Sequence, residues 1–442
     1  MFSKKDLMKL IIPLIIEQML SVTVGMADSM MVSRVGAEAA VSGVSLVDTI
    51  NVLLIGLFGA LATGGAVVSA QFLGRKEEKS ACKAGEQLIM AVLALSLVIM
   101  AAALLFSSGV LSLLFGDVGA DVMANARIFF FYSALSYPFI ALYNACAALF
   151  RSMGNSKVSM LVSAMMNIIN VLGNAIFLFG LGMGVAGSAI ATLIARMIAA
   201  LTMLFLLMNK KHPIHIGKLS GFRPNMVMIR RILQIGVPNG LENSVFQIGK
   251  IMVQGIIAGL GTSAITANAV ASTIGGFGVL PGSAVGLALI TVVGRCVGAG
   301  DYDGVKKYTF KLIKFAYAFM AVINILIICL LPVILWLYKL TDETAAITRS
   351  LMLYHCILAS LIWPLSFTLP NALRAANDVK FTMWISMISM WVWRIAFSYI
   401  LAIVLHVGVL GVWIAMTIDW LFRSIFFVTR FLRGKYRKIS LI

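Results

Sequence analysis

The stretch IPLIIEQMLSVTVGMADSMMV, residues 12–32, decides the fold class. It has the length and apolar character of a helix that crosses a bilayer, whose hydrocarbon core is about 30 Å thick. Yet it contains two carboxylates, Glu17 and Asp28. Lipid excludes such groups, so a membrane span keeps them only where the fold shelters them. The two acids therefore point to a functional region as well as to a membrane fold.

The composition of the whole chain agrees with this segment. Hydrophobic residues make up 61% of the 442 residues, and charged residues only 12%. The charged share is about half of the roughly 25% that is typical of globular domains. The mean hydropathy is +1.00. This composition excludes an ordinary soluble domain and predicts an all-α polytopic membrane protein.

Apolar runs and the polar breaks between them predict twelve transmembrane helices. The first six are expected near 10–33, 44–71, 87–113, 126–150, 158–180 and 186–208. The second six are expected near 232–259, 266–293, 311–336, 350–373, 381–405 and 409–430. We therefore expect an N-terminal six-helix lobe (1–208), a cytoplasmic linker (209–231) and a C-terminal six-helix lobe (232–442).

The positively charged residues predict the orientation of these helices. With the N-terminus placed in the cytoplasm, 27 of the 35 Lys and Arg residues fall on the inner side, 4 on the outer side and 4 within spans. Cytoplasmic loops are enriched in Lys and Arg, so both termini are expected in the cytoplasm. The net charge of +18 is then a topology signal and a contact for anionic lipid, not a nucleic-acid site.

The two halves of the chain match each other at a nearly constant offset. Glu17 falls on Glu242 at an offset of 225, and Arg151 falls on Arg374 at an offset of 223. Such matches at long period indicate a duplication. Because the offset contains an even number of spans, the two lobes are expected to be related by a pseudo-twofold axis normal to the membrane. This is a transporter architecture, and no nucleophile, metal cluster or catalytic dyad points to an enzyme.

Asp28 has potential partners at its own depth in the membrane. Counted from the outer ends of their spans, Asp28, Asn174 and Thr192 are about five or six residues inside, or roughly 8–9 Å at 1.5 Å per residue. Asn170 lies one turn below Asn174 on the same helix face. Carboxylate, amide and hydroxyl oxygens suit a small cation or surround a protonatable acid. We therefore predict a cation-binding site at Asp28, Asn170, Asn174 and Thr192; the alternative is interhelical hydrogen bonds that serve packing only.

The second lobe has no counterpart of this site. Asp28 maps onto Val253, and Thr192 maps onto Met416. Neither counterpart offers a hard oxygen ligand. An ion site in the first lobe only is therefore expected.

Further charged residues fall within the predicted spans. Glu17, Glu242 and Lys250 are candidates for the lining of a substrate cavity. Asp419 and Arg423 have the i,i+4 spacing of an ion pair within one helix. We expect that pair to be internal to the fold.

Several stretches resemble the multidrug and toxic compound extrusion (MATE) family. They are PLIIEQMLSVTVGMADSMMVSRVG (13–36), FRSMGNSK (150–157), NIINVLGNAIFLFGLGMGVAGSAIAT (167–192) and GVPNGLENSVFQIGKIMVQGIIAGLG (236–261). The resemblance covers essentially the whole chain. It implies a twelve-helix, secondary active multidrug efflux antiporter that works by alternating access without a cofactor. Such a protein exports lipophilic, often cationic compounds in exchange for H⁺ or Na⁺.

The resemblance also concerns single residues. The cation site of the family looks like Asp28, Asn170, Asn174 and Thr192 here. One branch of the family has an aspartate at the position of Asn174, which leaves the choice between H⁺ and Na⁺ open. Asp378 looks like an acidic position of another branch but lies at the edge of a predicted cytoplasmic loop.

The resemblance further implies a monomer in a prokaryotic cytoplasmic (inner) membrane. Its partners would be the lipid bilayer and a small amphipathic substrate. The alternative is a flippase of the same superfamily for a lipid-linked or amphipathic substrate. A flippase is expected to have additional helices and an arginine-rich cavity, whereas this chain has twelve predicted spans and carboxylates along its first helix.

Overall fold

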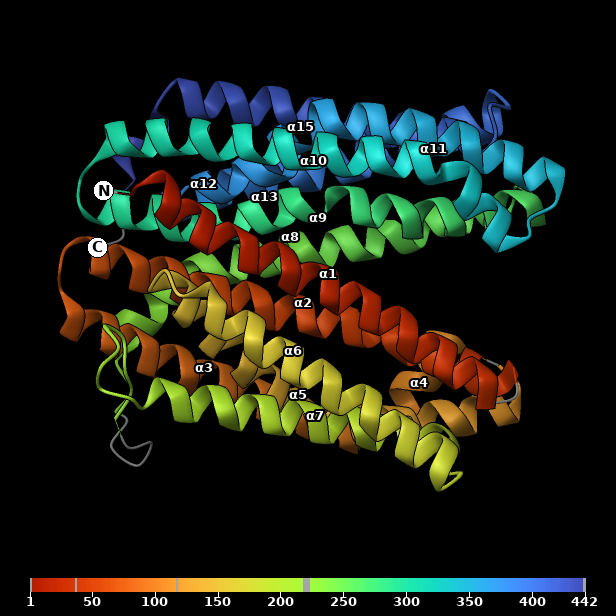
Figure 1. The fold of residues 1–442 in the computed structure, drawn as a ribbon, viewed down its shortest axis with the longest axis horizontal. Helices are drawn as coiled ribbons and strands as arrows, with labels where there is room; N and C mark the ends of the chain where they lie inside the picture. The colour runs from red at the N-terminus through yellow and green to blue at the C-terminus, as the bar shows by residue number, and fades with distance from the viewer. Residues whose placement is uncertain (1, 36–37, 117, 218–222, 440–442) are drawn as a thin grey trace. The chain divides into compact units, whose positions relative to one another are not determined.

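The computed structural model of the protein describes residues 2–35, 38–116, 118–217 and 223–439. Every regular element among these residues is a helix (Figure 1), which confirms the all-α prediction. The chain divides into two compact units, Ser3–Gly240 and Leu241–Ile442, and Phe2 belongs with the second. Residues 218–222 of the predicted linker lie outside the described residues, and the predicted lobe boundaries stay a prediction.

The unit Ser3–Gly240 is a bundle of long helices around α5. Its elements are α1 (Lys4–Val35), α2 (Glu38–Gly74), α3 (Glu78–Leu105), α4 (Ser107–Phe115), α5 (Ala120–Ser152), α6 (Ser156–Asn174), the π-helix η1 (Ala175–Gly180), α7 (Gly184–Leu207) and the first part of α8 (Met226–Ala258). Helix α5 packs against α2, α3 and α7, and α6 packs between α1 and α7 (Figure 1). Small residues such as Ala141, Ala145 and Ala148 let the neighbouring helices approach α5 closely.

The unit Leu241–Ile442 is built around α9 in a similar way. Its elements are the second part of α8, α9 (Thr262–Gly298), α10 (Tyr302–Tyr338), α11 (Asp342–Trp363), η3 (Pro364–Thr368), α12 (Leu369–Ala375), α13 (Val379–Ser389), η4 (Met390–Ala396), α14 (Phe397–Tyr399), η5 (Ile400–Val404), α15 (Val409–Leu432) and η6 (Lys435–Lys438). Helix α9 packs against α10, α11 and α12, and α15 packs against α11. Ala267, Ala271 and Ala284 on α9 are fully buried, so this helix forms the centre of the unit.

Eleven of the predicted spans overlap helices that are long and apolar enough to cross a membrane, among the residues that the structure describes. The span predicted at 87–113 extends beyond its helix, α3, into α4. The remaining predicted span, 232–259, lies in α8. This helix has 33 residues, or about 50 Å at 1.5 Å per residue, which exceeds the bilayer core. Asn239, Glu242 and Lys250 lower its hydropathy. The protein is a polytopic membrane protein, and the crossing by α8 stays a prediction.

Three of the predicted spans contain π-helical turns, and one of them, the span at 350–373, runs through α11, η3 and α12. The span at 381–405 is a succession of α13, η4, α14 and η5, and the span at 158–180 ends in η1. The turns η1, η4 and η5 are π-helical. Such turns are rare and frequently occur at functional sites. Here η1 follows Asn174 directly, and η4 contains Arg394.

Candidate functional site

Asp28 lies where α1 packs against α6. The Nδ2 atom of Asn174 donates a hydrogen bond to Oδ1 of Asp28 at 2.7 Å. Asn174 is the last residue of α6 and is completely buried. Its Oδ1 atom is buried without a hydrogen-bond partner among the described residues. The amide of Asn174 therefore donates to the carboxylate of Asp28, and its oxygen is free to accept a hydrogen bond or to coordinate a cation.

Asn170 lies one turn before Asn174 and faces both Asp28 and Thr192. In the amide orientation that matches donors with acceptors, Nδ2 of Asn170 donates to both carboxylate oxygens of Asp28, at 2.6 and 2.8 Å. Oδ1 of Asn170 then accepts from Oγ1 of Thr192 at 3.0 Å. The two amide orientations are related by a half-turn of one side-chain torsion, so the group can present either nitrogen or oxygen to Asp28.

The structure thus brings the four predicted cation-site residues together. They come from three packed helices: Asp28 from α1, Asn170 and Asn174 from α6, and Thr192 from α7. The five side-chain oxygens of this set, two of them on Asp28, are hard ligands of the kind that small cations prefer. Their arrangement can hold a proton on the carboxylate or a monovalent cation among the oxygens. Whether an ion binds there stays a prediction.

Two more charged residues belong to the surroundings of Asp28. Asp48 on α2 and Arg196 on α7 both interact electrostatically with Asp28. Asn51 donates to Oδ1 of Asp48 at 3.2 Å and accepts from Oη of Tyr137 at 3.0 Å. Asp48 was not among the predicted site residues, although it is a carboxylate within the predicted span 44–71 and carries the same signal as Asp28.

The three candidates for a substrate cavity differ in their environment. Glu17 forms an ion pair with Arg151 at 3.4 Å and accepts a hydrogen bond from Ser159 at 2.8 Å. Lys250 instead lines a cavity of the second unit, together with Arg394. That any of the three candidates contacts a transported compound stays a prediction.

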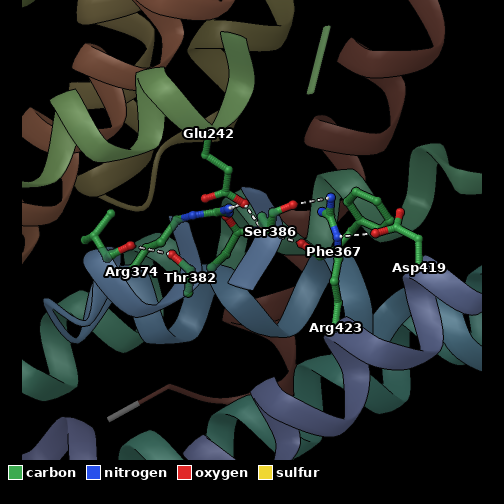
Figure 2. A network of polar contacts seen from close by, with 9 residues as sticks. Glu242, Phe367, Arg374, Thr382, Ser386, Asp419 and Arg423 are labelled. Carbon is green, nitrogen blue, oxygen red and sulfur yellow. Dashed lines mark hydrogen bonds and ion pairs between the residues drawn. The ribbon is translucent and has the colours of Figure 1, made fainter. Parts of the chain in front are cut away.

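Glu242 repeats the ion pair of Glu17 in the second unit. Its Oε1 atom lies 2.7 Å from Nη2 of Arg374 and accepts from Oγ of Ser386 at 2.6 Å, as Figure 2 shows. The glutamates and arginines of the two pairs are the residues that the duplication places opposite each other. The repeated pair therefore supports the internal duplication with a geometric observation.

Two further ion pairs account for other charged residues of the second unit. Nε of Arg423 donates to Oδ1 of Asp419 at 2.9 Å, which confirms the ion pair expected from their spacing (Figure 2). Arg430 binds both carboxylate oxygens of Asp378, at 2.6 and 3.0 Å. Because Arg430 donates to both carboxylate oxygens of Asp378, this acid stabilises the fold of the second unit through a bidentate ion pair.

Comparisons with known proteins agree with this architecture. The sequence profile of the family described as MatE matches residues 13–176 and 238–400. The two matches start 225 residues apart and end 224 apart, so the profile finds the duplication at the offset expected from the sequence.

Single relatives span nearly the full length of the chain. The uncharacterized transporter YisQ of Bacillus subtilis (strain 168) is 30% identical over 95% of this chain and 92% of its own length. The probable multidrug resistance protein NorM of Thermotoga maritima is 24% identical over 99% of this chain and 94% of its own length. An outward-facing structure of a multidrug resistance MATE family transporter has a TM-score of 0.90 at 20% identity, covering 99% of this chain and 97% of that one.

Proposed function

Because this chain belongs to the MatE family of membrane transporters, we propose that it is a secondary active multidrug efflux antiporter. It exports lipophilic and cationic compounds in exchange for H⁺ or Na⁺ by alternating access. It works as a monomer in the cytoplasmic membrane of a prokaryote, with both termini in the cytoplasm. No cofactor takes part, since the free energy comes from the ion gradient.

One observation carries this proposal: the Asp28 carboxylate is hydrogen-bonded by side-chain amides, which can rotate to present either their nitrogen or their oxygen. Asn174 and Asn170 donate to Asp28 and satisfy its negative charge. When Na⁺ arrives, rotation of the amides turns their oxygens toward the ion. When a proton arrives instead, the neutral acid no longer needs both donors. Either event changes the contacts among α1, α6 and α7.

This change of contacts can couple the ion to the substrate. A ligand shifts a conformational equilibrium only by its differential affinity for the two states. The ion reaches Asp28 from outside and stabilises the state that releases the drug, and its departure to the inside restores the drug-binding state. Each charge that moves inward supplies about 2.3 kcal/mol per 100 mV of membrane potential. The π-helical turn η1 directly after Asn174 supports a rearrangement at this point of α6.

The test is dye efflux from vesicles that contain the purified protein, driven separately by a Na⁺ gradient and by a pH gradient. The wild type is expected to respond to at least one gradient. The Asp28→Asn variant keeps the shape of the side chain but loses its charge, and should lose ion-driven efflux. Asp121→Asn is the matched control, because Asp121 is an exposed acid of the same unit. Unchanged efflux in the Asp28→Asn variant would refute the assignment of the ion site.

The same vesicles distinguish the antiporter from the flippase alternative. An antiporter needs an ion gradient to accumulate dye against its own gradient. A flippase that equilibrates an amphipathic lipid moves it without either ion gradient. Translocation of a fluorescent lipid at equal rates with and without both gradients, together with no dye efflux, would favour the flippase.

A further inference from the structure

A cavity of about 190 Å³ lies within the unit Leu241–Ile442, lined from α8, α9, α11, η4 and α15. It is separate from the Asp28 site, whose residues all belong to the other unit. Two cations line it, Lys250 on α8 and Arg394 on η4. No carboxylate is among the described residues that line it. The cavity therefore has the opposite charge from the surroundings of Asp28.

The nearby carboxylate of Asp419 neutralises these cations only in part. Asp419 is fully buried and already accepts from Arg423 at 2.9 Å and from Ser389 at 2.5 Å. Figure 2 shows Arg423 turned toward Asp419. Arg394 lies farther away, with Nη1 at 3.9 Å from Oδ2 of Asp419. One carboxylate thus faces two guanidinium groups, which leaves a surplus positive charge.

Two nitrogen atoms of the Arg394 guanidinium also lack hydrogen-bond partners among the described residues. Its Nε and Nη1 atoms are buried without a hydrogen-bond partner among the described residues. Lys250 has a cation–π contact with Phe246, 5.9 Å from its Nζ atom to the ring centroid, and no ion pair within 4.0 Å among the described residues. A buried guanidinium whose only nearby counter-charge is shared with a second arginine is costly, and arginine cannot lose its proton to relieve the cost. A bound anion would supply the missing partner.

The walls of the cavity are aromatic. Trp363, Trp413 and Trp420 line it and are 8%, 4% and 4% exposed. The indole N–H of Trp413 is occupied, because it donates to Oδ1 of Asn268 at 2.9 Å. Trp413 therefore offers its ring surface rather than a free donor to a ligand. Aromatic ligands pack favourably against such surfaces.

We propose that this cavity binds aromatic carboxylates, with Lys250 and Arg394 as the partners of the carboxylate and the three tryptophans as the partners of the ring. The volume suits this class, since a dry cavity of about 150 Å³ already holds benzene. As a statement about transport, the proposal rests on the proposed function and adds compounds with an acidic group to its substrates. As a statement about binding, it stands without transport.

Binding is measured by equilibrium dialysis of the full-length protein in an uncharged detergent. The probe is 2-naphthoate, and its matched counterpart is 2-naphthylmethylammonium, which has the same rings and the opposite charge. The wild type should bind the naphthoate at least about tenfold more tightly, as expected for a charge-assisted hydrogen bond. Equal binding of the two probes would overturn the proposal.

The variant that tests the site is Lys250→Gln, because Lys250 is exposed and its replacement leaves the core intact. It should weaken naphthoate binding about tenfold, and Lys250→Arg should restore it. The matched control is Lys314→Gln, an exposed lysine of the same unit outside the cavity, which should bind like the wild type. Wild-type affinity in Lys250→Gln would overturn the proposal.

Two further comparisons define the ligand and separate this proposal from the proposed function. Acetate should displace the naphthoate far less well than 2-naphthalenesulfonate does, and equal displacement would refute a role of the aromatic walls. If naphthoate binds as expected but no gradient drives efflux of any dye, the binding site stands and the antiport proposal fails. If dye efflux is ion-driven but naphthoate does not bind, the antiport proposal stands and the anion site is wrong.

Discussion

Replacing Glu242 by glutamine leaves the guanidinium of Arg374 buried without its counter-charge. The two side chains are only 7% and 11% exposed, and their charged atoms lie 2.7 Å apart. Arginine keeps its charge at any pH that a protein tolerates. Removal of one partner from a buried pair typically costs about 3–5 kcal/mol. We expect Glu242→Gln to lower the free energy of unfolding by that amount.

The double variant Glu242→Gln/Arg374→Gln should be much more stable than Glu242→Gln. It removes both charges, so no uncompensated charge remains in the second unit. The coupling energy of a double-mutant cycle measures this recovery. A large coupling energy would show that the pair, and not either side chain alone, stabilises the unit.

The duplicated pair of the first unit permits a comparison within one molecule. The distance from Glu17 to Arg151 is 3.4 Å, against 2.7 Å in the second unit. At an effective dielectric constant of about 20, the Coulomb energies are about 5 and 6 kcal/mol. The coupling energy of the second pair should therefore exceed that of the first by about 1 kcal/mol.

The assay is unfolding by sodium dodecyl sulfate in mixed micelles, followed by the loss of helical circular dichroism, because all seven tryptophans lie in the second unit and do not report on the first. The matched control is Glu78→Gln, because Glu78 is exposed at the start of α3. Two results would refute the reasoning. One is a loss of stability in Glu242→Gln no larger than in the control. The other is a double variant as unstable as the sum of its two single variants.

Two other predictions concern close packing and the ion site. A Cβ atom at Gly64 on α2 would lie 2.5 Å from the carbonyl oxygen of Ile232, so Gly64→Ala should cost about 1–3 kcal/mol in unfolding free energy. Gly59→Ala is its control, since nothing lies within 4 Å of that position; an equal loss in both would contradict the packing argument. Asn174→Asp would put a second carboxylate where Nδ2 now lies 2.7 Å from Asp28. Added Na⁺ or acid should then raise the thermal midpoint more than in the wild type, and an identical response of both proteins would count against an ion at this place.

Much of the candidate site was predictable because charge in a membrane is costly. That cost marks Asp28 as one of the candidate functional acids, and the count of residues from the span ends then places Asn170, Asn174 and Thr192 near its depth. The prediction used only the length of each span and its direction. The four side chains are in contact in the structure, since the number of residues from the end of a long, regular helix gives the depth of a side chain. Ion binding by these residues stays a prediction.

The same reasoning did not predict a functional role for Asp48 or Arg394, although both are charged residues within predicted spans. Their importance depends on lateral neighbours, which depth does not specify. Asp48 matters because α2 and α5 place Asn51 and Tyr137 beside it. Arg394 matters because Asp419, the acid near it, is already paired with Arg423.

The amino-acid sequence by itself determined the class of the fold, the positions of eleven spans and the duplication. These features follow from hydropathy, charge and repetition along the chain, which are properties of local segments. Apart from the i,i+4 pair of Asp419 and Arg423, which the spacing predicted, the tertiary structure alone decided which charges are paired and which are left over. Glu17 and Lys250 look alike in the sequence as charges within spans, yet the first has an arginine and a serine as partners and the second faces a cavity. The physical reason is that pairing depends on the rotation of each helix and on its neighbours, and both are set by the packing of helices that are distant in the chain.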